Sequence, residues 1–141
     1  MLALRPLLAA NDAFYRAFER ADPAAMDAVW AQSPEDVCVH PGWDMTRGAI
    51  NVANVWRRLF ASGERLSFAL GDLHAEIYSE VGIVHCIENI WIPSPRQMVG
   101  RVAATNVFRQ VDGAWKMILH HGSPVSGAPD DLAFVTTDLE N

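Results

Sequence analysis

The stretch TNVFRQVDGAWKMILHHGSP, residues 105–124, is the part of the chain that best indicates the fold. Apolar and polar residues alternate on both sides of Asp112-Gly113. An Asp-Gly pair between two alternating runs is a strong signal for a tight β-hairpin. The sequence therefore predicts two long antiparallel strands joined at this pair.

The two faces of this predicted hairpin differ in polarity. If Val111 pairs with Ala114, one face is apolar except for Asn106 and His121. The apolar face has to be covered, so Asn106 and His121 are expected to point into the protein, although a slip of one residue would reverse this. The other face is mixed and charged, and its members are Arg101, Thr105, Arg109, Lys116, Ile118 and His120.

Upstream of the hairpin, the hydrophobic pattern is first helical and then strand-like. Helical spacing covers residues 7–21, 26–30 and 49–60, with a short strand at residues 37–40. Asp22-Pro23 is a typical helix start, and Thr46 is the expected N-cap of the third helix. From Arg65 the period becomes two, and a change of parity at Gly71 predicts a bulge. This order predicts an α+β fold, with three N-terminal helices against one face of a curved antiparallel sheet.

Composition limits the classes of function. The chain has 141 residues, 50% of them hydrophobic, and a net charge of −6 without a basic cluster. We therefore expect one globular domain (residues 1–125) with a tail (126–141), and neither nucleic acid nor membrane as a partner. Cys38 and Cys86 are isolated thiols, either core residues or, less often, a disulfide. Without a signal peptide or an apolar run of ~20 residues, we expect a cytoplasmic protein.

Four segments in order carry a family resemblance: YRAFERADPAAMDAVW, VCVHPGW, RGAINVANVWRRLF and TNVFRQVDGAWKMILHHGSP. Together they resemble the nuclear transport factor two-like superfamily, and within it the SnoaL-like proteins. The last segment is also similar to the association domain of calcium/calmodulin-dependent protein kinases. The resemblance implies a cone-shaped fold, an apolar pocket between sheet and helices, and a homodimer formed through the outer sheet face. Members include enzymes and non-enzymes, so the fold does not choose the function.

The resemblance to one member, ketosteroid isomerase, points to three catalytic candidates. By position, Tyr15 matches its oxyanion donor, His40 before Pro41 matches its base, and Asn106 matches its second acid. His40 replaces a carboxylate and Asn106 replaces a protonated acid, so the steroid reaction itself is not implied. Two donors facing an imidazole would still suit enolisation of a carbonyl compound, or ring opening, without a cofactor or metal.

Each candidate also has a structural alternative. Tyr15 sits beside an apolar stripe and would serve equally as a packing residue, and His40 would simply bond backbone at the strand end. His121 would bond the following backbone or Tyr15. Asn106 needs a partner of some kind, because an unpaired buried amide costs roughly 1–3 kcal/mol.

Four residues are expected to line the pocket: Trp43, Trp56, Phe108 and His121. Trp43 follows Pro41-Gly42, where it would form a wall or lid. Residues 81–92 form a strand with His85 and Asn89 on one face and Cys86 and Glu88 on the other, and either face could be inward. The histidines lack the spacing typical of a metal site.

Two hypotheses follow. The first is a SnoaL-like protein that binds a small apolar carbonyl- or carboxylate-bearing molecule, with isomerase, cyclase or hydrolase chemistry if it is an enzyme. The second is a non-catalytic binding or oligomerisation module. An open cavity where Tyr15, His40 and Asn106 converge favours the first, and a cone filled by tryptophan and phenylalanine favours the second. In both, the candidate dimer contacts are Arg101, Arg109, Lys116 and Ile118.

Overall fold

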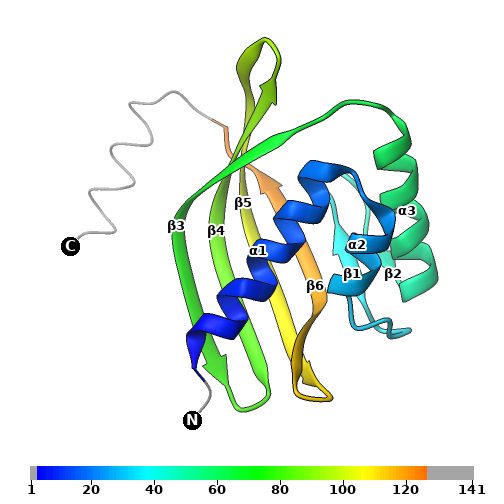
Figure 1. The fold of residues 1–141 in the computed structure, drawn as a ribbon, viewed down its shortest axis with the longest axis vertical. Helices are drawn as coiled ribbons and strands as arrows, with labels where there is room; N and C mark the ends of the chain where they lie inside the picture. Colours follow the sequence, from blue (N-terminus) through cyan, green and yellow to red (C-terminus); the bar gives the residue numbers. More distant parts are fainter. Residues whose placement is uncertain (1–2, 127–141) are drawn as a thin grey trace.

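The computed structural model describes residues 3–126, so the expected tail lies outside the described residues apart from Ser126. Three helices lie on one side of a six-stranded sheet (Figure 1). The elements are α1 Leu4–Arg20, α2 Pro23–Val29, β1 Val37–Val39, β2 Thr46–Arg47, α3 Ala49–Ala61, β3 Ser67–Tyr78, β4 Val81–Pro93, β5 Arg96–Val111 and β6 Ala114–Pro124. The α+β fold predicted from the sequence is confirmed.

The sheet has the strand order β2-β1-β6-β5-β4-β3 and does not close into a barrel. Strands β3 to β6 form the antiparallel meander that the alternating pattern predicts. Strand β1 runs parallel to β6, so the sheet is mixed rather than wholly antiparallel. This short parallel strand places the end of β1 beside the middle of β6.

Helix α1 crosses the concave face of the sheet (Figure 1). Its buried face includes Leu7, Phe14 and Ala17. At one point the helix approaches the sheet very closely, because a Cβ on Gly82 of β4 would lie 2.7 Å from Leu7 Cδ1. A glycine at this position therefore allows the helix to lie directly on the strand.

Two predicted helix starts have different outcomes. Asp22 is the N-cap of α2, as expected, and its side chain accepts a hydrogen bond from the Ala25 backbone nitrogen at 3.1 Å. Thr46 is not the N-cap of α3, so that prediction is wrong. Thr46 instead pairs with β1 as part of β2, and α3 begins after Gly48. Because Thr46 and Arg47 have the extended conformation of β2, the helix cannot begin before Gly48.

The β5–β6 hairpin corrects the predicted direction of two histidines. Val111 pairs with Ala114 as expected, but the register shifts by one residue between Phe108 and Val107 because Ile118 is an extra residue in β6. Beyond this bulge the alternation of β6 is reversed. His120 is therefore buried opposite Asn106, and His121, predicted to point inward, is exposed on the outer face.

The bulge that the sequence predicts at Gly71 is confirmed. The β3–β4 register shifts between Gly71 and His74. After it, Ala75 and Ile77 pack against the core, whereas Leu73 is exposed. Cys38 and Cys86 are both buried free thiols.

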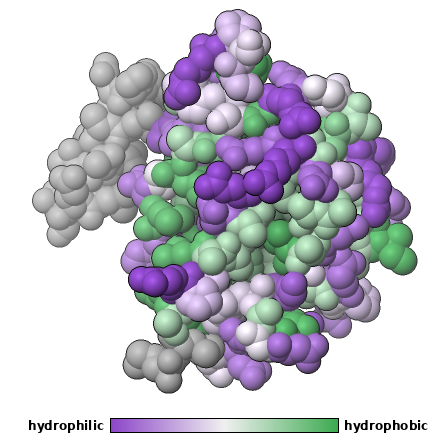
Figure 2. All heavy atoms as spheres, viewed as in Figure 1, coloured by the Kyte–Doolittle hydropathy of each residue, from purple (hydrophilic) through white to green (hydrophobic). Residues whose placement is uncertain are grey.

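The helix side of the surface is mixed in polarity. Figure 2 shows apolar patches interrupted by hydrophilic side chains on the helix side of the molecule. Within residues 3–126, no helix combines the length and the hydropathy needed to cross a bilayer.

Candidate functional site

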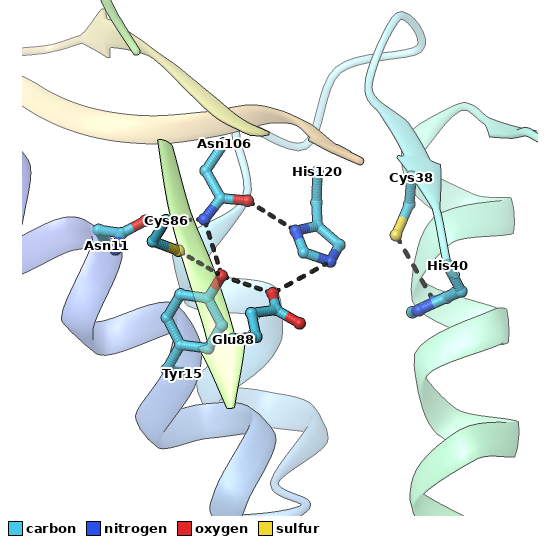
Figure 3. Close-up of polar contacts among 8 residues, drawn as sticks. All are labelled: Asn11, Tyr15, Cys38, His40, Cys86, Glu88, Asn106 and His120. Atoms are coloured by element: carbon cyan, nitrogen blue, oxygen red, sulfur yellow. Dashed lines mark hydrogen bonds and ion pairs between the residues drawn. The ribbon is translucent and has the colours of Figure 1, made fainter. Parts of the chain in front are cut away.

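Five polar side chains meet between α1 and the concave face of the sheet, and we call them the polar cluster (Figure 3). Its members are Asn11 and Tyr15 of α1, Glu88 of β4, Asn106 of β5 and His120 of β6. Each is at most 3% exposed. Polar groups at this depth require hydrogen-bond partners, and each of the five side chains in this cluster makes at least one hydrogen bond to another member.

Asn106 is the centre of the hydrogen-bond network. Its Nδ2 donates to Asn11 Oδ1 at 2.8 Å and to the Tyr15 hydroxyl oxygen at 3.1 Å. Its Oδ1 lies 2.6 Å from His120 Nδ1. Because an amide oxygen can only accept, His120 Nδ1 is the donor. The remaining ring nitrogen of a neutral His120, Nε2, is therefore an acceptor.

Tyr15 connects this network to a buried carboxyl group. Its hydroxyl donates to Glu88 Oε2 at 2.6 Å and lies 3.4 Å from Cys86 Sγ. Burial raises the pKa of Glu88 to about 7, although the hydrogen bond from Tyr15 opposes this shift. Burial, with the nearby Glu88 charge, also raises the pKa of Tyr15. Glu88 can therefore gain or lose a proton near neutral pH, and Tyr15 keeps its proton.

His120 does not form an ion pair with this carboxyl group at neutral pH. Its Nε2 lies 4.0 Å from Glu88 Oε2, beyond hydrogen-bond distance. Burial, together with the neighbouring His40 and His121, lowers the pKa of His120 to about 3. A neutral imidazole and a titratable carboxyl group thus face each other without a shared proton.

His40 lies in the same interior but makes no hydrogen bond to the polar cluster. Its Nε2 is 3.5 Å from Cys38 Sγ, and its ring packs edge-on against Trp56 at 4.6 Å between centroids. The His40 and His120 rings are 6.3 Å apart. Burial lowers the pKa of His40 to about 4, so it is neutral at neutral pH. The Trp43 ring also contacts the His40 ring, at 5.2 Å between centroids, and Trp43 is 51% exposed.

The structure thus brings some predicted site residues together and separates others. Tyr15 contacts Asn106, but the donor groups of both are bonded to protein acceptors rather than facing His40. Trp56 and Phe108 are fully buried. The prediction that His121 lines the interior is wrong, because the bulge at Ile118 turns it outward.

Sequence reasoning missed Asn11 and His120 and left the face of Glu88 open. Asn11 is part of the α1 stripe, where it looks like an interruption of an apolar face. Glu88 lies on the Asn106 face because Val99, an extra residue in β5, shifts the β4–β5 register. The strand alternation places Glu88 on the same face as Cys86 and Val84, but both faces of this strand contain apolar residues, so the sequence carries no signal for which face is inward.

The polar cluster is closed to solvent in this conformation. Four hollows of about 420 to 670 Å³ lie on the outside of the protein, and no polar-cluster residue lines them. The interior beside the cluster is filled in part by Trp56 and Phe108. Among residues 3–126, no group of three or more histidine, cysteine, aspartate or glutamate side chains is placed to hold a metal ion.

Comparisons with known proteins agree with this architecture. The SnoaL-like domain family matches residues 7–127. A proposed dehydratase of the NTF2-like family from Streptomyces avermitilis is 34% identical, with a TM-score of 0.80, over 88% of this chain and 96% of that one. A proposed calcium/calmodulin-dependent protein kinase type II association domain from Thiobacillus denitrificans is also 34% identical, with a TM-score of 0.78, over 84% and 94%.

A more distant structure shares the fold alone. It is an NTF2-like protein of unknown function from Pseudomonas putida, 16% identical, with a TM-score of 0.76 over 88% of this chain and 87% of that one. No curated protein sequence matches the chain. From the family match and the fold, the chain belongs to the SnoaL-like domain family of the NTF2-like superfamily.

Proposed function

We propose that the protein binds a small, largely apolar molecule inside the cone and transfers protons to and from it without a cofactor. The observation that carries this proposal is the buried carboxyl group of Glu88, whose pKa is raised to about 7. A group that titrates near the working pH is well suited to general acid–base catalysis. Strongly perturbed, desolvated carboxyl groups also gather at functional sites.

In this proposal Glu88 is the proton-transferring group and His120 Nε2 is a second acceptor beside it. Asn106 holds His120 in the tautomer that leaves Nε2 free, and Tyr15 holds Glu88 by its hydroxyl. Tyr15 and Asn106 thus position other groups, a different role from the oxyanion donors expected at first. His40 remains a second candidate for the base, because its ring is neutral at neutral pH.

The proposed entrance is the turn at residues 41–45. Trp43 and Met45 are both about half exposed there, and Trp43 covers His40. Since the polar cluster is closed, binding requires this turn or a neighbouring segment to move. The 34% identical relative described as a proposed dehydratase supports an enzymatic role of this acid–base kind.

Exchange of an acidic C–H proton tests this function. In D₂O, the wild type should accelerate exchange of the α-protons of 2-tetralone, followed by NMR, and Glu88→Gln should remove most of the acceleration. His121→Phe, on the outer face, is the control and should match the wild type. If His40→Ala removes the acceleration while Glu88→Gln does not, the base is His40. Equal exchange with and without the protein would overturn the catalytic proposal.

A non-catalytic module is the second candidate, because the interior is closed and one 34% identical relative is described as a kinase association domain. Native mass spectrometry of the purified protein separates the two. A co-purified small molecule supports the ligand-binding function, whereas assemblies without any bound molecule and without catalysed exchange support the module.

We also propose a homodimer through the outer sheet face. Ile83, Val107 and Leu119 are paired across β4, β5 and β6 on this face and are only partly buried. Arg101, Arg109 and Ile118 lie around them as further candidate contacts. Sedimentation should give a dimer at micromolar concentration and a monomer for Val107→Glu. A wild-type monomer would contradict this assembly.

A further inference from the structure

Two hydrogen-bond acceptors of the polar cluster face each other with no donor between them. His120 Nε2 and Glu88 Oε2 are 4.0 Å apart. The nearby donors are already used: Tyr15 donates to Glu88, and both hydrogens of Asn106 Nδ2 go to Asn11 and Tyr15. An atom ~2.8 Å from both acceptors would lie only about 2 Å to the side of the line joining them. The pair is therefore spaced for one bridging donor.

Among the described residues that face this pair, none is cationic near pH 7. Among residues 3–126, the buried polar side chains include no lysine or arginine. The titratable groups that face Glu88 are Tyr15 on α1, Cys86 on the same strand, His120 on β6 and Cys38 on β1. Burial raises the pKa of Cys38, raises that of Cys86 to about 11, and lowers that of His120 to about 3. All of these neighbours are neutral near pH 7, so an ionised Glu88 has no cationic partner.

We infer that the ligand of this site presents a hydroxyl or protonated amine to His120 Nε2 and Glu88 Oε2, and carries no negative charge at that end. This inference rests on the proposed function and narrows its ligand class. A carboxylate at this position would place a third acceptor against two others and a second anion beside Glu88. Burying a second unpaired charge in this way is strongly unfavourable. The carboxylate-bearing ligands left open by the sequence are therefore excluded from this end of the site.

Three probes that share one ring and differ only in the polar group test the inference. These are benzyl alcohol, benzylamine and benzoate, titrated at pH 8 into the full chain and followed by NMR shifts of the protein amides. We expect benzylamine and benzyl alcohol each to bind at least about tenfold more tightly than benzoate. The amide shifts should centre on Tyr15, Glu88, Asn106 and His120. Benzoate binding at this place as tightly as benzylamine would overturn the inference while leaving the binding function in place.

A matched pair of variants assigns the effect to the carboxyl group. Glu88→Gln keeps the size of the side chain and should weaken benzylamine about tenfold or more while changing benzyl alcohol much less. Glu76→Gln, the same substitution on the exposed face of β3, should bind all three probes as the wild type does. If Glu88→Gln binds benzylamine like the wild type, the inference is wrong. Absence of binding for all three probes would overturn both the inference and the binding function beneath it.

Discussion

Two clusters lie in contact in the interior, and they differ in what they contribute. The aromatic cluster consists of Phe14, Phe18, Trp56, Phe60 and Phe68, packed at 4.6 to 6.2 Å between ring centroids, mostly edge-on or tilted. The polar cluster touches it through Phe14, whose ring is 4.8 Å from that of Tyr15 and 4.7 Å from that of His120. The aromatic cluster contains no ionisable group, whereas the polar cluster contains a desolvated carboxyl group and a desolvated imidazole.

The aromatic cluster mainly stabilises the fold, whereas the polar cluster holds the groups that we propose act on a ligand. Aromatic side chains in contact supply large apolar burial with favourable geometry. The polar cluster is satisfied by hydrogen bonds, but desolvation disfavours the ionised form of Glu88, and apolar replacements of buried ionisable groups are often neutral or stabilising. Replacing Glu88 with an uncharged side chain and truncating a side chain of the aromatic cluster should therefore change the free energy of unfolding in opposite directions.

The largest effect is expected in the aromatic cluster. Trp56→Ala removes a side chain that is 1% exposed and should lower the free energy of unfolding by about 3–5 kcal/mol. Trp43→Ala, at a tryptophan that is 51% exposed, should cost less than about 1 kcal/mol. Urea unfolding of both variants checks this. If both variants lost a similar free energy of unfolding, Trp56 would not be a core residue distinct from the exposed Trp43.

The next effect has the opposite sign and depends on pH. The pKa of Glu88 is raised from 4.5 to about 7 in the folded protein, so its contribution to stability is complete below pH 4.5 and is lost as the pH rises through 7. Glu88→Gln should therefore equal the wild type near pH 4.5 and exceed it by about 3 kcal/mol at pH 8. The comparison with the wild type at each pH is needed because His40 and His120, with lowered pKa values, destabilise both proteins on acidification.

The control for this prediction is Glu76→Gln. The pKa of Glu76 is lowered, mainly by the hydrogen bond from Tyr78, so removing its charge should give no gain in stability at pH 8. A Glu88→Gln variant that is less stable than the wild type at pH 8 would contradict the raised pKa.

A smaller loss is expected at the centre of the polar network. Asn106→Leu leaves Asn11 Oδ1 and His120 Nδ1 without their partner and should cost about 2 kcal/mol. The same substitution at the exposed Asn54 of α3 should change stability by less than about 0.5 kcal/mol. Chemical denaturation checks both. Equal effects would mean that the network contributes nothing beyond side-chain volume.

The smallest effect is expected at His121. Because this residue is exposed on the outer face, His121→Ala should change the free energy of unfolding by less than about 0.5 kcal/mol. His120→Ala, one position earlier, should be clearly destabilising, because it removes the donor to Asn106 Oδ1. If His121→Ala were more destabilising than His120→Ala, His121 rather than His120 would point inward, and the polar cluster would not be formed as described.

His120 and His121 also show how much of the fold and of the site can be predicted from the sequence. Alternation and the Asp112-Gly113 turn predict the strands and the hairpin tip, because both depend on local residues. The inward faces beyond the tip depend on Ile118 in β6 and Val99 in β5, each an extra residue that reverses the alternation. A bulge of this kind leaves the composition of a strand unchanged, so the pattern alone assigned His121 inward and could not place Glu88.

The central claim is that Glu88 is a buried carboxyl group that titrates near neutral pH. The most direct measurement is its side-chain carboxyl ¹³C chemical shift, followed by NMR from pH 4 to pH 9 in the folded protein, with Glu88→Gln to assign the signal. The account predicts a midpoint near pH 7, raised from 4.5 by burial. A midpoint at or below pH 4.5 would contradict it.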